Sequence, residues 1–243
     1  MRTFSFPAKK SIALLLDPDK SKGESLQKIL KIAEESNTDY IFAGGSLTFN
    51  SIDNLIDSIR ELCSIPIVLF PGNLLQLTHK ADIILLLSLI SGRNAELLIG
   101  NHVIASPYLK SVKKKLVPVG YVLISCGSKT SVEYISQTEA IPSDKPEIAV
   151  ATALAGEMLG LGMIYLEAGS GASNPVPESL IKAVRESISI PLAVGGGIKS
   201  RKEVKEIFDA GADLIILGNG CEKNPTLLIE ACLVRDKFRT KIH

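Results

Sequence analysis

Three apolar runs in the C-terminal third each end in glycine, and this recurrence constrains the fold more than any other feature. The runs with their endings are 163–172 (MIYLEAGSGA), 191–197 (PLAVGGG) and 214–220 (LIILGNG). Glycine lets the backbone approach a ligand closely and leaves its N–H groups uncovered. We therefore interpret the three endings as one phosphate site built from three loops. The alternative is that each glycine only makes a tight turn.

Five further apolar runs precede these three, at 11–16, 40–43, 66–70, 81–87 and 117–125. They are almost continuously apolar, which is typical of parallel strands buried on both faces. Most are followed by a helical pattern of apolar residues, and a capping box at 200–203 begins the helix that Gly211 ends. Eight such units predict a (β/α)8 TIM barrel that occupies residues 1–243 as a single domain.

The third unit of this barrel is irregular. Only about ten residues separate the run at 66–70 from the run at 81–87, whereas a crossover connection needs a dozen or more. We expect a short helix or irregular turn near 74–79, so the third helix is atypical. A long apolar helix is predicted at 95–109, a surface excursion at 127–146, and a helix that has Pro177 as its first residue.

Charge and cysteine content exclude several classes of protein. Lys plus Arg number 27 and Asp plus Glu 26, so the cationic excess typical of nucleic-acid binding is missing. The four cysteines show no zinc-binding spacing, which favours free thiols in a reducing compartment. Residues 1–7 lack the apolar core of a signal peptide, and the run at 83–90 is too short to span a bilayer. We expect a soluble, cytoplasmic protein.

Polar residues at the predicted strand ends are few, and they are the candidates for chemistry. Active sites of TIM barrels lie at the carboxyl ends of the strands, and phosphate is often held after strands seven and eight. Asp17, Ser46 and Glu167 end the first, second and sixth strands. Asp17 and Ser46 belong to neighbouring strands and together suit Mg²⁺ shared with substrate phosphates. The alternatives are a turn at Asp17 and a helix cap at Ser46.

The chain resembles the geranylgeranylglyceryl phosphate synthases and their bacterial relatives, the heptaprenylglyceryl phosphate synthases. The resemblance covers nearly the whole chain and rests on matching motifs in the same order: 16–20 (LDPDK), 44–46 (GGS), 165–171 (YLEAGSG), 194–199 (VGGGIK) and 218–219 (GN). The YLEAGSG motif is quite specific, whereas GGGI and GN occur in many phosphate-binding barrels.

This resemblance implies a Mg²⁺-dependent prenyltransferase with a TIM-barrel fold. It would form an ether between the 3-hydroxyl of sn-glycerol 1-phosphate and a long isoprenyl diphosphate, such as geranylgeranyl diphosphate, and release diphosphate. Asp17 and Ser46 would hold Mg²⁺. Glycerol phosphate would be held by Tyr165, Leu166, Glu167, Ala168, Gly169, Ser170, Gly171, Gly195, Gly196, Gly197, Gly218 and Asn219. Some relatives have lysine two residues before the metal aspartate, where this chain has Leu15.

The residues themselves agree with this chemistry. Mg²⁺ bound at Asp17 neutralises a leaving diphosphate, and Glu167 can take or orient the proton of the attacking hydroxyl. Apolar residues of 97–109, with Tyr108, Tyr121 and Val122, are candidates for a prenyl groove, although core packing is an alternative for most of them. We expect a homo-oligomer that packs through 95–109, with peripheral membrane contact through its lipid product.

Two other functions remain open on the sequence. One is another phosphate-binding barrel enzyme, an isomerase or a lyase, which would usually carry catalytic Lys, Asp or Cys residues on several strands. The other is a non-catalytic module that binds phosphate or lipid, which would keep the glycines but would not need Asp17 or Glu167.

Overall fold

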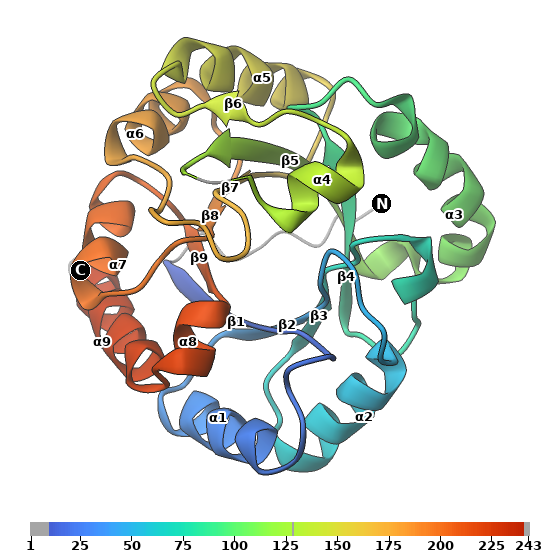
Figure 1. Ribbon diagram of the computed structural model, residues 1–243, viewed down its shortest axis with the longest axis vertical. Coiled ribbons are helices and arrows are strands. Elements are labelled where there is room, and N and C mark those ends of the chain that lie inside the picture. Colours follow the sequence, from blue (N-terminus) through green and yellow to red (C-terminus); the bar gives the residue numbers. More distant parts are fainter. Residues whose placement is uncertain (1–9, 128, 241–243) are drawn as a thin grey trace.

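A closed barrel of eight parallel strands forms the centre of the computed structural model, which describes residues 10–127 and 129–240. In the order around the barrel the strands are β4 (Ile83–Leu89), β3 (Ile67–Leu69), β2 (Tyr40–Ala43), β1 (Ser11–Leu16), β9 (Leu214–Leu217), β8 (Leu192–Gly195), β7 (Met163–Glu167) and β5 (Leu116–Ser125). Pairing of β4 with β5 closes the barrel. The predicted TIM barrel is confirmed, and Figure 1 looks down into it.

Helices form a ring outside the strands (Figure 1). They are α1 (Gly23–Glu35), α2 (Ile52–Leu62), α3 (Asn101–Leu109), α5 (Pro146–Met158), α6 (Glu178–Ser187), α7 (Arg201–Asp209) and α9 (Thr226–Thr240). The shorter α4 (Ser131–Ser136) and α8 (Asn219–Lys223) lie inside this ring in the view of Figure 1. The capping box that begins α7 is present, because Glu203 N donates to Ser200 Oγ and Ser200 N donates to the Glu203 carboxylate.

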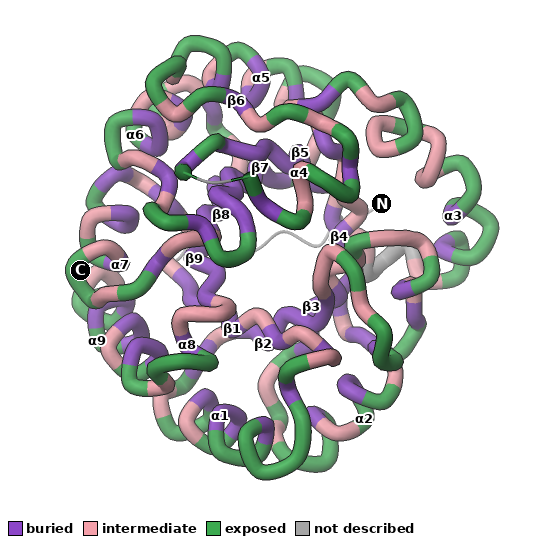
Figure 2. Tube along the Cα trace, viewed as in Figure 1, coloured by how far each residue is buried: buried purple, intermediate pink, exposed green. Residues whose placement is uncertain are grey.

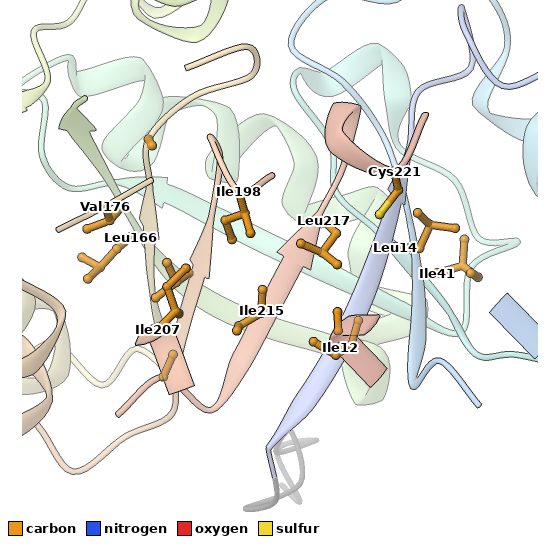
Figure 3. Close-up of a cluster of buried hydrophobic side chains, with 14 of the residues drawn as sticks. Ile12, Leu14, Ile41, Leu166, Val176, Ile198, Ile207, Ile215, Leu217 and Cys221 are labelled. Atoms are coloured by element: carbon orange, nitrogen blue, oxygen red, sulfur yellow. The ribbon is translucent and has the colours of Figure 1, made fainter. Parts of the chain in front are cut away.

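Strand alternation divides the core into two layers. Ala13, Phe42, Tyr121, Tyr165 and Ile216 belong to the cluster inside the barrel. Their sequence neighbours point outward and pack under the helices, as Figure 3 shows for Ile12, Leu14, Ile41, Leu166 and Ile215. In Figure 2 the strands are mostly buried, and exposure is concentrated in the outer helices and loops. Burial on both faces explains why the strand sequences do not alternate between apolar and polar residues.

The irregular third unit is confirmed. Between β3 and β4 there is only one 3₁₀ turn, η1 (Leu74–Gln76). The helix predicted at 95–109 consists of a π-helical turn, η2 (Glu96–Gly100), followed by α3, and it continues into a 3₁₀ segment, η3 (Lys110–Lys115). Pro107 lies inside α3, where it cannot donate the hydrogen bond of a regular helix.

Other differences from the predicted elements are local. The excursion at 127–146 contains α4 and a two-residue strand, β6 (Ile141–Pro142), paired with β5. Pro177 precedes helix α6 as its N-cap and is not its first residue, because its ψ of 139° is extended. The short helix α8 lies between β9 and α9 and was not predicted.

All four cysteines are free thiols, as expected. Among the described residues, none of the helices has the length and hydropathy needed to cross a bilayer. Residues 1–7, on which the expectation of a missing signal peptide rests, lie outside the described ranges. The assignment of residues 1–243 to a single domain stays a prediction.

Candidate active site

The three glycine endings meet at one end of the barrel. β7, β8 and β9 are neighbours and parallel, so their carboxyl ends lie together. Asn219 Nδ2 donates to Ser170 Oγ at 2.9 Å, which links the loop after β9 to the loop after β7. We call residues 169–171, 195–197 and 218–220 the glycine corner. The structure therefore brings together the residues predicted to hold phosphate, and their role stays a prediction.

Two glycines of this corner are required by the packing. Gly196 has a φ of +83°, and a Cβ at this position would lie 2.4 Å from Glu167 Oε1. Gly197 has a φ of +71°, and its Cβ would lie 2.2 Å from the Asn174 carbonyl oxygen. A side chain at either position would be strained and would push the loop away from β7. The loop after β8 thus passes directly over the Glu167 carboxylate.

Glu167 is the last residue of β7, and its side chain is buried with 6% exposure. The Gly169 N–H donates to its Oε1 at 2.7 Å. Burial raises the pKa of this carboxyl group, while the hydrogen bond donated by Gly169 N lowers it. A carboxylate with a raised pKa is a better proton acceptor than an exposed one. The geometry therefore suits Glu167 to acid–base chemistry.

An aromatic cluster surrounds this acid inside the barrel. The rings of Tyr165 and Tyr121 meet edge to face at 5.2 Å, and Phe70 contacts both. Burial, with the nearby charge of Glu167, raises the pKa of Tyr165 well above its usual value. The remaining members of the predicted binding segment have different surroundings, because Leu166 and Ala168 pack in the outer layer of the core.

Asp17 and Ser46 lie in the loops that follow β1 and β2. Asp17 Oδ1 accepts a hydrogen bond from Asp19 N at 2.9 Å. A Cβ on Gly45 would lie 3.4 Å from Asp17 Oδ2, so this carboxylate faces the bare backbone next to Ser46. Ser46 itself is partly exposed and follows the end of β2 by three residues.

The carboxylate of Asp17 and the hydroxyl of Ser46 are ligands of the kind that Mg²⁺ takes, and a Mg²⁺ ion shared with a substrate stays a prediction. In the described part of the chain, no three His, Cys, Asp or Glu side chains are grouped to hold a metal. A cation here would therefore take one carboxylate and one hydroxyl from the protein and its other oxygens from water or a phosphate. Mg²⁺ commonly binds in this way, because it retains waters and accepts phosphate oxygens.

An apolar cavity of about 160 Å³ opens beside Ser46. Of the predicted groove residues, Tyr121 and the helical residues Leu97, Ala105 and Leu109 line it. Val122 packs in the outer core, and Tyr108 contacts the His79 ring at 4.1 Å. The lining residues that sequence reasoning missed come from β4, η1 and α4, and they include Leu74, Leu77, Leu85, Leu87, Val132 and Ile135.

The irregular third unit explains why this cavity exists. A regular crossover helix between β3 and β4 would cover these strands, but η1 is a single turn. Residues of η1 form one wall of the cavity and residues of α3 form another. The short connection at 70–82 was the available signal in the sequence, although it did not identify the lining side chains.

Comparisons with known proteins identify the family of this chain. The PcrB family matches residues 8–235. Geranylgeranylglyceryl phosphate synthase of Spirosoma linguale is 46% identical over the whole chain and 98% of its own length. The synthase of Pyrococcus horikoshii is 37% identical over 90% of this chain and 86% of its own.

Solved structures lead to the same family. The crystal structure of (S)-3-O-geranylgeranylglyceryl phosphate synthase from Thermoplasma acidophilum, in complex with its substrate sn-glycerol-1-phosphate, has a TM-score of 0.87 and 29% identity. The match covers 96% of this chain and 94% of that one. A thiamine phosphate pyrophosphorylase from Pyrococcus furiosus, at 15% identity and a TM-score of 0.59, shares the fold. From the extent of the family match and the identity to these synthases, we conclude that this chain belongs to the PcrB family.

Proposed function

We propose that this protein is a prenyltransferase that joins sn-glycerol 1-phosphate to a long isoprenyl diphosphate, with geranylgeranyl diphosphate as the first donor to test. An ether would form at the glycerol 3-hydroxyl, and diphosphate would leave. One observation carries the proposal: the glycine corner and the apolar cavity open at the same end of the barrel. Tyr121 lines the cavity and contacts Tyr165, which neighbours the buried Glu167.

The glycine corner suits the phosphate of the acceptor. Its loops offer backbone N–H groups, and such concave sets of N–H groups bind anions. With phosphate at this corner, the glycerol hydroxyls would lie near Glu167, since Gly196 packs directly over its carboxylate. Glu167 would accept hydrogen bonds from the glycerol and take the proton as the ether forms.

The cavity suits the donor. Its leucine side chains offer an apolar surface to an isoprenyl chain, and Ser46 stands at its edge. We propose that Asp17 and Ser46 hold Mg²⁺, which when bound neutralises the charge of the diphosphate leaving group. Closely packed aromatic rings beside the cavity would keep water away from the reacting carbon.

A transfer assay tests the proposal directly. The protein is incubated with sn-glycerol 1-phosphate, labelled geranylgeranyl diphosphate and Mg²⁺, and the lipid product is extracted into organic solvent. We expect labelled ether product. Its formation should stop when a chelator removes Mg²⁺, and it should fall strongly when sn-glycerol 3-phosphate replaces sn-glycerol 1-phosphate. Donors of increasing length, up to heptaprenyl diphosphate, establish which chain is preferred. If no donor of the series gives product, the proposed function is wrong.

We also propose that the protein assembles with copies of itself. The outer face of η2 and α3 carries Ile99, Val103 and Ile104, whose side chains are 60%, 63% and 64% exposed. Burying apolar surface of this kind against a second copy is favourable. Light scattering after size-exclusion chromatography tests this, and Ile104→Glu should shift the protein towards the monomer. A wild-type monomer at all concentrations would contradict it.

A cytoplasmic location with peripheral contact to the membrane completes the proposal. A long isoprenyl donor and its ether product both partition into bilayers, so the reaction would take place at a membrane surface. Sedimentation with vesicles, in the presence and absence of product, measures this contact. Equal recovery of the protein in the supernatant under both conditions would argue against it.

A further inference from the structure

Lys20 connects the two halves of the proposed site. Its ammonium group donates to Asn219 Oδ1 at 3.1 Å and lies 3.6 Å from Asp17 Oδ2. Asn219 in turn donates to Ser170 Oγ. A continuous polar chain therefore runs from the loop after β1, through the loop after β9, to the loop after β7. Lys20 is the cation of this chain.

This contact is poorly explained as a stabilising ion pair. The side chains of Lys20 and Asp17 are 47% and 22% exposed, and exposed pairs contribute little to folding stability. Lys20 also pairs with a residue three positions away in the same loop, so it does not tie distant elements together through Asp17. A cation that remains partly exposed beside the glycine corner can bind an incoming anion.

A second lysine stands near the same corner, but its contact is different. Lys199 Nζ donates to the Ser173 carbonyl oxygen at 2.8 Å. Ser173 lies beyond the glycine corner, whereas Asn219, the partner of Lys20, is part of it. The geometry therefore favours Lys20 over Lys199 as the cation that meets a phosphate at this corner.

Strand β1, which runs below this corner, contributes no charged side chain to the barrel interior. Leu15 points to the same side as Asp17, and its side chain would lie 3.7 Å from a Cβ on Gly218. An aliphatic side chain at this position cannot neutralise a phosphate held by the loop after β9. Lys20 contacts the same loop through Asn219 and is therefore placed to supply a positive charge there.

We infer that Lys20 binds the phosphate of the acceptor at the glycine corner. This inference rests on the proposed function, because it assigns Lys20 to the glycerol phosphate and not to the diphosphate. Charge-assisted hydrogen bonds are stronger than neutral ones. Removing the charge-assisted hydrogen bond between Lys20 and the phosphate should weaken acceptor binding about tenfold, because the site is partly exposed.

Calorimetric titration with sn-glycerol 1-phosphate, and with inorganic phosphate, tests the inference without any donor. For Lys20→Met we expect an increase in Kd of about tenfold for both ligands. Lys20→Arg should retain most of the affinity. Lys22→Met, which alters an exposed lysine two residues further along at the start of α1, is the matched control and should bind as the wild type does.

A second-site rescue sharpens the test. Leu15→Lys in the Lys20→Met background should recover part of the lost affinity, because the new ammonium group would reach the corner from inside the barrel. In steady-state assays Lys20→Met should raise KM for the acceptor and leave KM for the donor nearly unchanged. Melting temperatures of all variants establish that they are folded.

Three results would overturn the inference. The first is unchanged phosphate affinity in folded Lys20→Met, and the second is a larger loss in Lys199→Met. The third is an effect confined to KM for the diphosphate donor. Because phosphate binding is measured without a donor, a failure of the transfer activity itself would be recognised separately.

Discussion

The two halves of the barrel mouth are built in different ways. The glycine corner, after β7, β8 and β9, is made mainly of backbone, and few side chains cover it. The apolar cavity, beside β3 and β4, is made of side chains from β4, η1, α3 and α4. From this contrast we expect the acceptor to be recognised by main-chain geometry and the donor by the shape and apolar lining of the cavity.

The arrangement of helices explains this division. On the side of the corner, α6 and α7 follow their strands as regular units and complete the outer ring (Figure 1). On the other side the connection between β3 and β4 contains only η1, and the irregular η2 and α3 follow β4. Regular packing fixes the backbone of the glycine corner, whereas the absence of a crossover helix between β3 and β4 leaves the apolar cavity open.

The largest effect is expected where the two halves meet, at Asp17. Asp17→Ala removes the carboxylate proposed to hold Mg²⁺, so turnover should fall below detection at any Mg²⁺ concentration. Transfer activity measured across a Mg²⁺ titration tests this. The melting temperature should stay close to that of the wild type, because the residue lies in a loop and is partly exposed. Substantial activity in this variant would remove Asp17 from the mechanism.

The second largest effect is expected at Glu167, where substitution should lower the rate and leave acceptor binding largely unchanged. Glu167→Gln keeps the size of the side chain but removes the proton acceptor, and loss of a general base typically lowers kcat about 10²–10⁴-fold. The affinity for sn-glycerol 1-phosphate should change much less. Measurement of kcat and of Kd on the same preparation separates these effects. A stable variant with near-normal kcat would exclude the catalytic role.

The same substitution should also change the pH dependence of stability. Burial raises the pKa of Glu167, so the folded protein holds this proton at pH values where the unfolded chain has lost it. Its ionisation therefore costs stability as the pH rises above the unfolded value. We expect Glu167→Gln to melt at a higher temperature than the wild type near neutral pH, with a smaller difference at acidic pH. A constant difference across this range would contradict the assignment.

A smaller effect, on KM for the donor, is expected from a substitution in the apolar cavity. Ala105→Phe should fill part of the cavity, because Ala105 is buried and lines it. KM for geranylgeranyl diphosphate should rise about tenfold, while acceptor affinity is kept. The neighbouring Ser106 is exposed on the same helix, so Ser106→Phe is the matched control. Overpacking can cost about 1–3 kcal/mol, and melting temperatures show whether lost stability explains the result. Equal KM values in both variants would place the donor elsewhere.

The same contrast explains which features could be predicted from the sequence and which could not. Glycine endings, Asp17, Ser46 and Glu167 are local features of the chain, and the barrel brings them to one end because parallel strands share a direction. The lining of the cavity is not local, since Leu74, Leu87 and Ile135 come from segments that meet only after folding. The sequence also predicted too regular a helix at 95–109, where propensity does not reveal the π-helical turn at Glu96–Gly100.

The smallest effect should appear within the glycine corner, and it tests whether the corner binds through its backbone. Gly171 has a φ of +80°, and nothing lies within 4 Å of a Cβ built there. Gly171→Ala keeps the N–H group and adds only backbone strain, about 1–2 kcal/mol. For a chain of this size each kcal/mol lowers the melting temperature by about 2–4 °C. Phosphate affinity should stay within about threefold of the wild type, since a loss of that size is well under 1.4 kcal/mol.

Gly197→Ala is the matched comparison. It has a similar positive φ, but its new Cβ would meet the Asn174 carbonyl oxygen at 2.2 Å, so the loop itself must move. Phosphate binding should therefore weaken more in this variant than in Gly171→Ala, even though both add a single methyl group. Calorimetric titration with phosphate and thermal melts on the pair decide the matter. If Gly171→Ala lost affinity as strongly as Gly197→Ala, the Cβ at 171 itself would obstruct the phosphate, and the corner would bind its ligand closer to Gly171 than to the loop after β8.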